Sequence, residues 1–101
     1  MINAKFTIRG ADASFVVSGH SKSARSGKDI VCAAASSATI MAANTITEIL
    51  GVKAEVKDSD GYVQLSFVNS EAAADIVKGL KMHFELLAQR YPHFVKVTTE
   101  V

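Results

Sequence analysis

Apolar and polar side chains alternate in the first residues of the chain. Residues 2–8 carry an apolar side chain at every second position, which is the period of a strand with one buried face. The Gly10-Ala11-Asp12 segment has residue types that favour a turn, and residues 13–18 return as an apolar run. These three segments predict two strands joined as a hairpin.

The same alternation returns in the middle of the chain. Residues 52–57 alternate valine or alanine with charged side chains, and residues 62–67 again place an apolar side chain at every second position. Between them, residues 58–61 have the sequence Asp-Ser-Asp-Gly, which is typical of a tight turn. We therefore expect a second hairpin, and residues 94–101 predict a closing strand.

Two longer segments have the pattern of helices. Residues 29–50 are rich in alanine, the strongest helix former, and are apolar on nearly every side. This composition predicts a buried helix that ends at the glycine following it. A second helix, capped by Asn69 or Ser70, has one apolar stripe at helical spacing and is expected to end at Tyr91-Pro92.

The predicted order is strand, strand, helix, strand, strand, helix, strand. Because helices are interleaved with hairpins, we expect an α+β fold in which one mixed or mainly antiparallel sheet packs against two helices. The chain has 101 residues, enough for one hydrophobic core, and no linker or low-complexity tract divides it. Residues 1–101 are therefore expected to form a single domain.

Composition and charge exclude several classes of function. Hydrophobic residues make up 49% of the chain and charged residues 21%, as in globular rather than disordered proteins. The net charge of +1 gives no support for binding to nucleic acid or a membrane surface. No apolar run reaches the roughly 18 residues that cross a bilayer, and no secretory pattern begins the chain. A single cysteine allows no internal disulfide and fits a reducing cytoplasm.

That single cysteine lies where the first helix is predicted to begin. Cys32 falls in the first two turns whether Ser26 or Asp29 caps the helix, and the dipole and free amides there favour a thiolate and could stabilise an oxyanion. His20 ends the preceding strand, twelve residues upstream of the cysteine. The pattern favours a nucleophile and base pair in which Cys32 attacks a carbonyl and His20 protonates the leaving amine.

The residues around Cys32 include further polar side chains, and two roles are open both for Asp29 and for the basic residues of the loop. Asp29 and Ser36 share one polar stripe with Cys32 along the helix. Asp29 would either orient His20 or, by its negative charge, disfavour the thiolate. The basic residues between His20 and Cys32 either make the site electropositive or form an ordinary solvated loop.

Two segments closely resemble a known family. Gly19-His20-Ser21 and residues 27–36 (Gly-Lys-Asp-Ile-Val-Cys-Ala-Ala-Ala-Ser) resemble the bacterial ribosomal-processing cysteine protease family, Prp. Asn44-Thr45-Ile46 is similar to a later segment of that family, and length and element order match along the whole chain. Ala35 stands where the family has valine, and the loop between His20 and Cys32 is unusually basic and lacks an aromatic residue.

The resemblance implies a cysteine endopeptidase that removes a short N-terminal extension from a large-subunit ribosomal protein. It implies Cys32 as the nucleophile and His20 as the base, with Asp29 and Ser36 in supporting roles. It also implies a homodimer, which we expect in the cytoplasm. The loop that covers the substrate would consist of Ser21, Lys22, Ser23, Ala24, Arg25, Ser26, Gly27 and Lys28.

Cys32 also allows other interpretations. A lone cysteine in an alanine-rich helix is often a small buried hydrophobe, and the chain would then be a non-catalytic peptide- or ribosome-associated binding module. An exposed cysteine is also open to oxidation, which would suit a redox sensor. The chain has no second cysteine that could form a disulfide with the oxidised Cys32, which counts against this interpretation. One cysteine and three scattered histidines show no ligand spacing, so no metal or other cofactor is expected.

Overall fold

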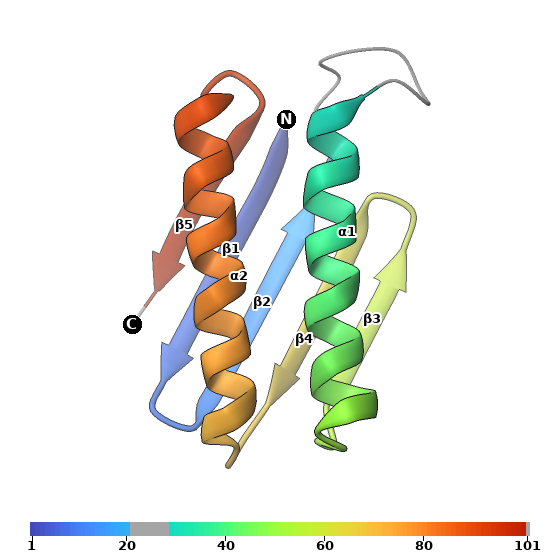
Figure 1. Ribbon diagram of the computed structural model, residues 1–101, viewed down its shortest axis with the longest axis vertical. Helices are drawn as coiled ribbons and strands as arrows, with labels where there is room; N and C mark the ends of the chain where they lie inside the picture. The colour runs from blue at the N-terminus through green and yellow to red at the C-terminus, as the bar shows by residue number, and fades with distance from the viewer. Residues whose placement is uncertain (21–28, 101) are drawn as a thin grey trace.

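The computed structural model describes residues 1–20 and 29–100, and its elements follow the predicted order (Figure 1). They are β1 (Ile2–Arg9), β2 (Asp12–Ser18), α1 (Ile30–Asn44), a π-helical turn η1 (Thr45–Ile49), β3 (Glu55–Ser59), β4 (Tyr62–Phe67), α2 (Glu71–Arg90) and β5 (Val95–Glu100). The predicted α+β fold, one sheet with two helices, is confirmed.

The five strands form one mixed sheet in the order β3-β4-β2-β1-β5. The β1–β5 pair is parallel and the other three pairs are antiparallel. The parallel pair arises because α2 carries the chain back along the sheet, from β4 to the edge beside β1. Both helices lie on one face of the sheet and run in opposite directions (Figure 1).

The core lies between the sheet and the two helices. Strand pairing sets Phe6 opposite Phe15 and Phe15 opposite Leu65, so these side chains form a row across the inner face. The ring centroid of Phe6 lies 6.3 Å from that of Phe15 and 6.0 Å from that of Phe84 in α2. All four side chains are buried, and tilted aromatic pairs at these separations pack favourably. This row anchors α2 to the three central strands.

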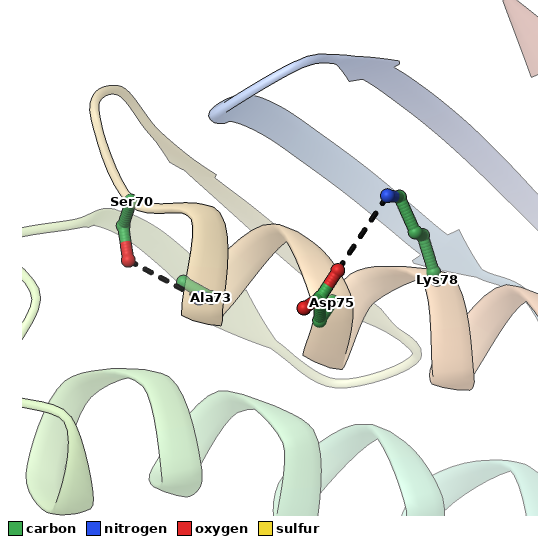
Figure 2. Close-up of polar contacts among 4 residues, drawn as sticks. All are labelled: Ser70, Ala73, Asp75 and Lys78. Carbon is green, nitrogen blue, oxygen red and sulfur yellow. Dashed lines mark hydrogen bonds and ion pairs between the residues drawn. The ribbon is translucent and has the colours of Figure 1, made fainter.

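Helix α2 begins where the sequence predicts. The Ser70 hydroxyl accepts a hydrogen bond from the Ala73 N–H at 3.1 Å, which satisfies one free amide of the first turn (Figure 2). Of the two predicted caps the structure therefore has Ser70, while Asn69 adopts a left-handed backbone with φ of 60°. Lys78 pairs with Asp75 at 3.5 Å on the exposed side of the helix, where such a pair contributes little to stability.

Helix α1 is only partly buried, and the prediction of a helix covered on all sides is wrong. Val31 and Ala35 face the core, whereas Ile30, Ile40 and Met41 are 67%, 56% and 68% exposed. Apolar residues occur on every side of this helix, but it rests on the sheet with one side and contacts α2 with another. The remaining apolar side chains therefore face outward.

The predicted helix over residues 29–50 divides into α1 and η1. The hydroxyl of Thr45 donates to the carbonyl of Met41 at 2.7 Å, and the N–H of Leu50 donates to the carbonyl of Thr45 at 2.9 Å. The second bond has the five-residue spacing of a π-helix, which widens the last turn. Segment Ile30–Ile49 is long and apolar enough to cross a membrane, by length and composition alone. The core helix of a globular protein meets the same criterion, and in this structure the segment packs on the sheet.

Strand β3 begins later than predicted and lies at the edge of the sheet. The prediction placed a strand over residues 52–57, but Val52 donates its N–H to the carbonyl of Ile46 at 3.0 Å and so follows the end of the helix. Only Asp60-Gly61 forms the turn, because β3 and β4 pair up to the residues on either side of it. The hairpin itself is present as predicted.

Candidate active site

Cys32 lies in the first turn of α1 and is half-buried. Asp29 precedes the helix in an extended conformation, and its Oδ1 accepts the N–H of Cys32 at 2.9 Å. The carbonyl of Asp29 accepts the N–H of Ala33 at 3.1 Å. Asp29 is therefore the helix cap, one of the two starts that the sequence allowed. The N–H of Cys32 is therefore engaged by the cap and is not a free donor for an oxyanion.

His20 lies two residues after the end of β2 and is held through its backbone. The N–H of Gly19 donates to the carbonyl of Gly61 at 2.8 Å, and the nitrogen of Met1 donates to the carbonyl of His20 at 2.6 Å. Gly19 has φ of +90°, and a Cβ at this position would collide with the carbonyl oxygen of Met1. Only glycine fits this close approach, so the position of His20 depends on the β1 start and on the β3–β4 turn.

The sulfur of Cys32 lies 4.0 Å from Nδ1 of His20. When the imidazole proton is on Nε2, Nδ1 is an acceptor that faces the thiol, as a general base requires. The separation is long for a hydrogen bond, and such contacts often shorten when substrate binds. The contact joins the segment that follows β2 to the first turn of α1.

A groove extends along α1 from Cys32. It has a volume of about 360 Å³ and lies between this helix and the β3–β4 hairpin. Cys32, Ser36 and Thr47 contribute to its helix wall and share one side of the helix. Since a helix rises about 1.5 Å per residue, this wall is about 22 Å long from Cys32 to Thr47. An extended peptide of about seven residues has that length.

The hairpin wall of the groove carries two carboxylates. Asp58 pairs with Val63 across β3 and β4, so its side chain lies on the inner face of the sheet with this valine. Asp60, in the turn, also lines the groove. Val56 and Ile40 add apolar side chains on the two walls. The groove therefore presents apolar side chains with an acidic edge, which is suited to a peptide with apolar and basic residues.

The structure describes four of the predicted site residues. The structure brings together Cys32, His20 and Asp29, and Ser36 lines the groove one turn further along α1. The predicted substrate loop, residues 21–28, lies outside the described residues. Within the described chain, no group of three or more His, Cys, Asp or Glu side chains is arranged to hold a metal ion.

The sequence did not reveal that the β3–β4 hairpin belongs to the site. Residues 58–61 were predicted as a turn, but their contact with the residues around His20 depends on strand order, which no local pattern states. Asp58 follows the alternating apolar residues of 52–56, but it is exposed on an edge strand, where charged side chains are common, so no local signal distinguished it.

The whole sequence can be placed in a family. The family model described as Cysteine protease Prp matches residues 1–96, nearly the entire chain. The chain belongs to this Prp family. The resemblance carried by residues 19–36 is thereby confirmed, and so is the prediction that the protein is a cysteine protease. No curated protein matches the chain significantly.

Solved structures share the Prp fold over the whole chain. An essential ribosomal processing protease Prp from S. aureus, in complex with a covalently linked product peptide, has a TM-score of 0.90 and 21% identity and covers 99% of this chain and 100% of its own. The same protease with a substrate peptide has a TM-score of 0.84 and 19% identity, with the same coverage. SMU.848 from Streptococcus mutans has a TM-score of 0.77 and 26% identity, covering 98% of this chain and 93% of its own.

Proposed function

We propose that this Prp protein is an endopeptidase in which Cys32 is the nucleophile and His20 the general base. The thiol proton passes to Nδ1 of His20 as the sulfur attacks the carbonyl carbon of the scissile peptide bond. His20 then gives this proton to the leaving amine, and a thioester remains on Cys32. Water, deprotonated by His20, hydrolyses the thioester and restores the thiol. The 4.0 Å contact between Sγ and Nδ1 carries this proposal.

The substrate in this proposal is a bacterial large-subunit ribosomal protein, from which a short N-terminal extension is removed. The S. aureus protein that shares the fold is described as an essential ribosomal processing protease, and its structures contain a substrate peptide or a product peptide. The groove beside Cys32 supports the same class of substrate here, because it is long enough to hold several residues of a chain end in an extended conformation.

Asp29 and Ser36 have supporting roles in this proposal. Asp29 fixes the first turn of α1 and with it the backbone of Cys32. Ser36 contributes an exposed hydroxyl to the groove wall, where it is available to a peptide backbone. Residues 1–101 act as one protease domain.

The enzyme acts as a cytoplasmic homodimer in this proposal. A reducing compartment fits a chain whose single cysteine must stay reduced to react. The outer sides of α1 and α2 expose apolar residues, among them Met41, Met82 and Leu86, and a second copy would remove them from water. Sedimentation of the wild type and of Met41→Glu tests the dimer, because a charge in a buried apolar interface should shift the protein to monomer.

Cleavage of a peptide is the decisive experiment for the proposed activity. The peptide copies the N-terminal extension and the following residues of the large-subunit ribosomal protein from the same organism. We expect the wild type to cut it once, with products identified by mass, and Cys32→Ala and His20→Ala to be at least 100-fold slower. Ser37→Ala is the matched control, since Ser37 is exposed on α1 and does not line the groove.

Two results would contradict the proposal. If the wild type binds the peptide without cutting it, the chain is a binding module. If His20→Ala cuts as fast as the wild type while Cys32→Ala is inactive, the protein is a cysteine protease with another base. Circular dichroism of each variant must show the wild-type fold for either conclusion.

A further inference from the structure

The imidazole of His20 lies between the thiol and the β3–β4 turn. Its Nδ1 faces Cys32, as described above, while its Nε2 edge lies against Gly61. A Cβ at residue 61 would be 2.7 Å from Nε2 and 3.3 Å from each of the two neighbouring ring carbons. Carbon and nitrogen atoms that are not bonded do not approach to 2.7 Å, so the ring occupies space that any side chain at this position would fill.

We propose that Gly61 is a positioning residue for His20, and that its missing side chain keeps Nδ1 directed at the sulfur of Cys32. The same residue holds the backbone next to the histidine, because its carbonyl accepts the N–H of Gly19 at 2.8 Å. The turn thus contacts the edge of the His20 ring that faces away from the thiol. It also fixes the backbone of Gly19, the residue that precedes His20. This inference rests on the proposed function, since positioning matters for cleavage only if His20 is the base.

A backbone requirement alone does not account for this contact. Gly10 in the β1–β2 turn has φ of +62° and Gly51 has φ of +64°, close to the +68° of Gly61. At those two positions a Cβ would meet nothing within 4 Å. A side chain there costs only the strain of a left-handed backbone, whereas at residue 61 it also collides with the imidazole.

The collision would be relieved by His20 rather than by the fold. His20 is exposed, and its ring is the end of a side chain with two rotatable bonds. Rotation about these bonds removes the clash at little cost to folding, but it moves Nδ1 away from Cys32. A displacement of about 1 Å in a catalytic group reduces rates by about 100-fold. Substitution of Gly61 should therefore affect the reactivity of Cys32 far more than stability.

Three variants of the full chain separate these effects. Gly61→Ala adds both strain and the collision. Gly61→Asn adds the collision with less strain, because asparagine tolerates a left-handed backbone, as Asn69 does in this chain. Gly10→Ala is the matched control, since it adds strain in an equivalent hairpin turn far from the site.

The measurements are peptide cleavage, melting temperature, and the rate at which iodoacetamide alkylates Cys32 across a range of pH. We expect both Gly61 variants to lose about 10- to 100-fold in cleavage rate. Their alkylation profiles against pH should match that of His20→Ala rather than that of the wild type. Gly61→Asn should melt at a higher temperature than Gly61→Ala, and Gly10→Ala should keep wild-type cleavage and alkylation despite a lower melting temperature.

Wild-type rates of cleavage and alkylation in both Gly61 variants would overturn the inference. A loss of cleavage rate in Gly10→Ala as large as that in the Gly61 variants would also overturn it. The outcome for His20→Ala distinguishes this failure from failure of the proposed function. If His20→Ala is inactive and the Gly61 variants are active, the base is correctly assigned and only the positioning role is wrong. If His20→Ala is active, the proposed function itself fails.

Discussion

The carboxylate of Asp29 holds the backbone of Cys32, with Oδ1 accepting its N–H at 2.9 Å. The donor is the amide of the proposed nucleophile, so one bond both starts α1 and fixes the residue that carries the thiol. The same contact places a negative charge beside the positive end of the helix, where it is favourable. The cap therefore links the stability of the helix start to the geometry of the site.

Replacing Asp29 tests whether the hydrogen bond or the charge matters. Asparagine caps helices about as well as aspartate, whereas alanine does not. We expect Asp29→Ala to lower the free energy of unfolding by about 1 kcal/mol, measured by urea denaturation, and Asp29→Asn to lower it by less than about 0.5 kcal/mol. A fully folded Asp29→Asn protein that no longer cleaves peptide would show that the site needs the charge as well as the bond.

Gly19 should be the least replaceable glycine near the site. Gly19→Ala combines a φ of +90° with a collision against the backbone oxygen of Met1, which no side-chain rotation can relieve. We expect a loss of about 2 kcal/mol or more in unfolding free energy, together with loss of cleavage as His20 shifts. Gly10→Ala, with strain and no collision, should lose about 1 kcal/mol and remain active. Equal stability of the two variants would contradict the role given to the Met1 contact.

The sequence predicted those features that depend on neighbours along the chain. Alternation in residues 2–8 and 13–18 is enough to identify β1 and β2, because one face of each strand is buried. Ser70 and Asp29 were each one of two predicted helix caps, because a side-chain oxygen three residues before a free amide is a local relationship. The order of elements followed directly.

Features that depend on distant contacts were missed or wrong. The outward exposure of Ile40 and Met41 could not be predicted from composition, because it depends on which sides of α1 the sheet and α2 cover. The start of β3 was misplaced because Val52 bonds to the helix end, which competes with strand pairing. The contact between Gly61 and His20 depends on strand order, and no local pattern in the sequence states that order.

Gly79 should be a position where the chain gains stability. It lies within α2, is exposed, and a Cβ there would meet nothing within 4 Å. Glycine in a helix interior costs about 1 kcal/mol relative to alanine, so we expect Gly79→Ala to raise the unfolding free energy by about 0.5 to 1 kcal/mol. Urea denaturation provides the measurement. A destabilised variant would show that the space beside Gly79 is occupied in solution, for example by a second copy of the chain.

The far end of the groove should set how long a peptide the enzyme recognises. Ala43 lines the groove about 16 Å along α1 from Cys32. A leucine there would narrow the groove without reaching the thiol. We expect Ala43→Leu to raise KM for a long peptide by about 10-fold, because a bulky side chain displaces peptide groups worth about 1.4 kcal/mol of binding. The kcat should stay near the wild-type value, since the interaction lost is equal in ground state and transition state.

Peptide length provides the internal control for this prediction. A peptide that ends before it reaches Ala43 should be cleaved by Ala43→Leu and by the wild type with the same kcat and KM. Ser37→Leu, on an exposed side of α1 that does not line the groove, should leave both peptides unaffected. An unchanged KM for the long peptide in Ala43→Leu would mean that the substrate leaves the groove near Cys32. Recognition would then depend on the residues close to the scissile bond, with the remainder of the groove unused.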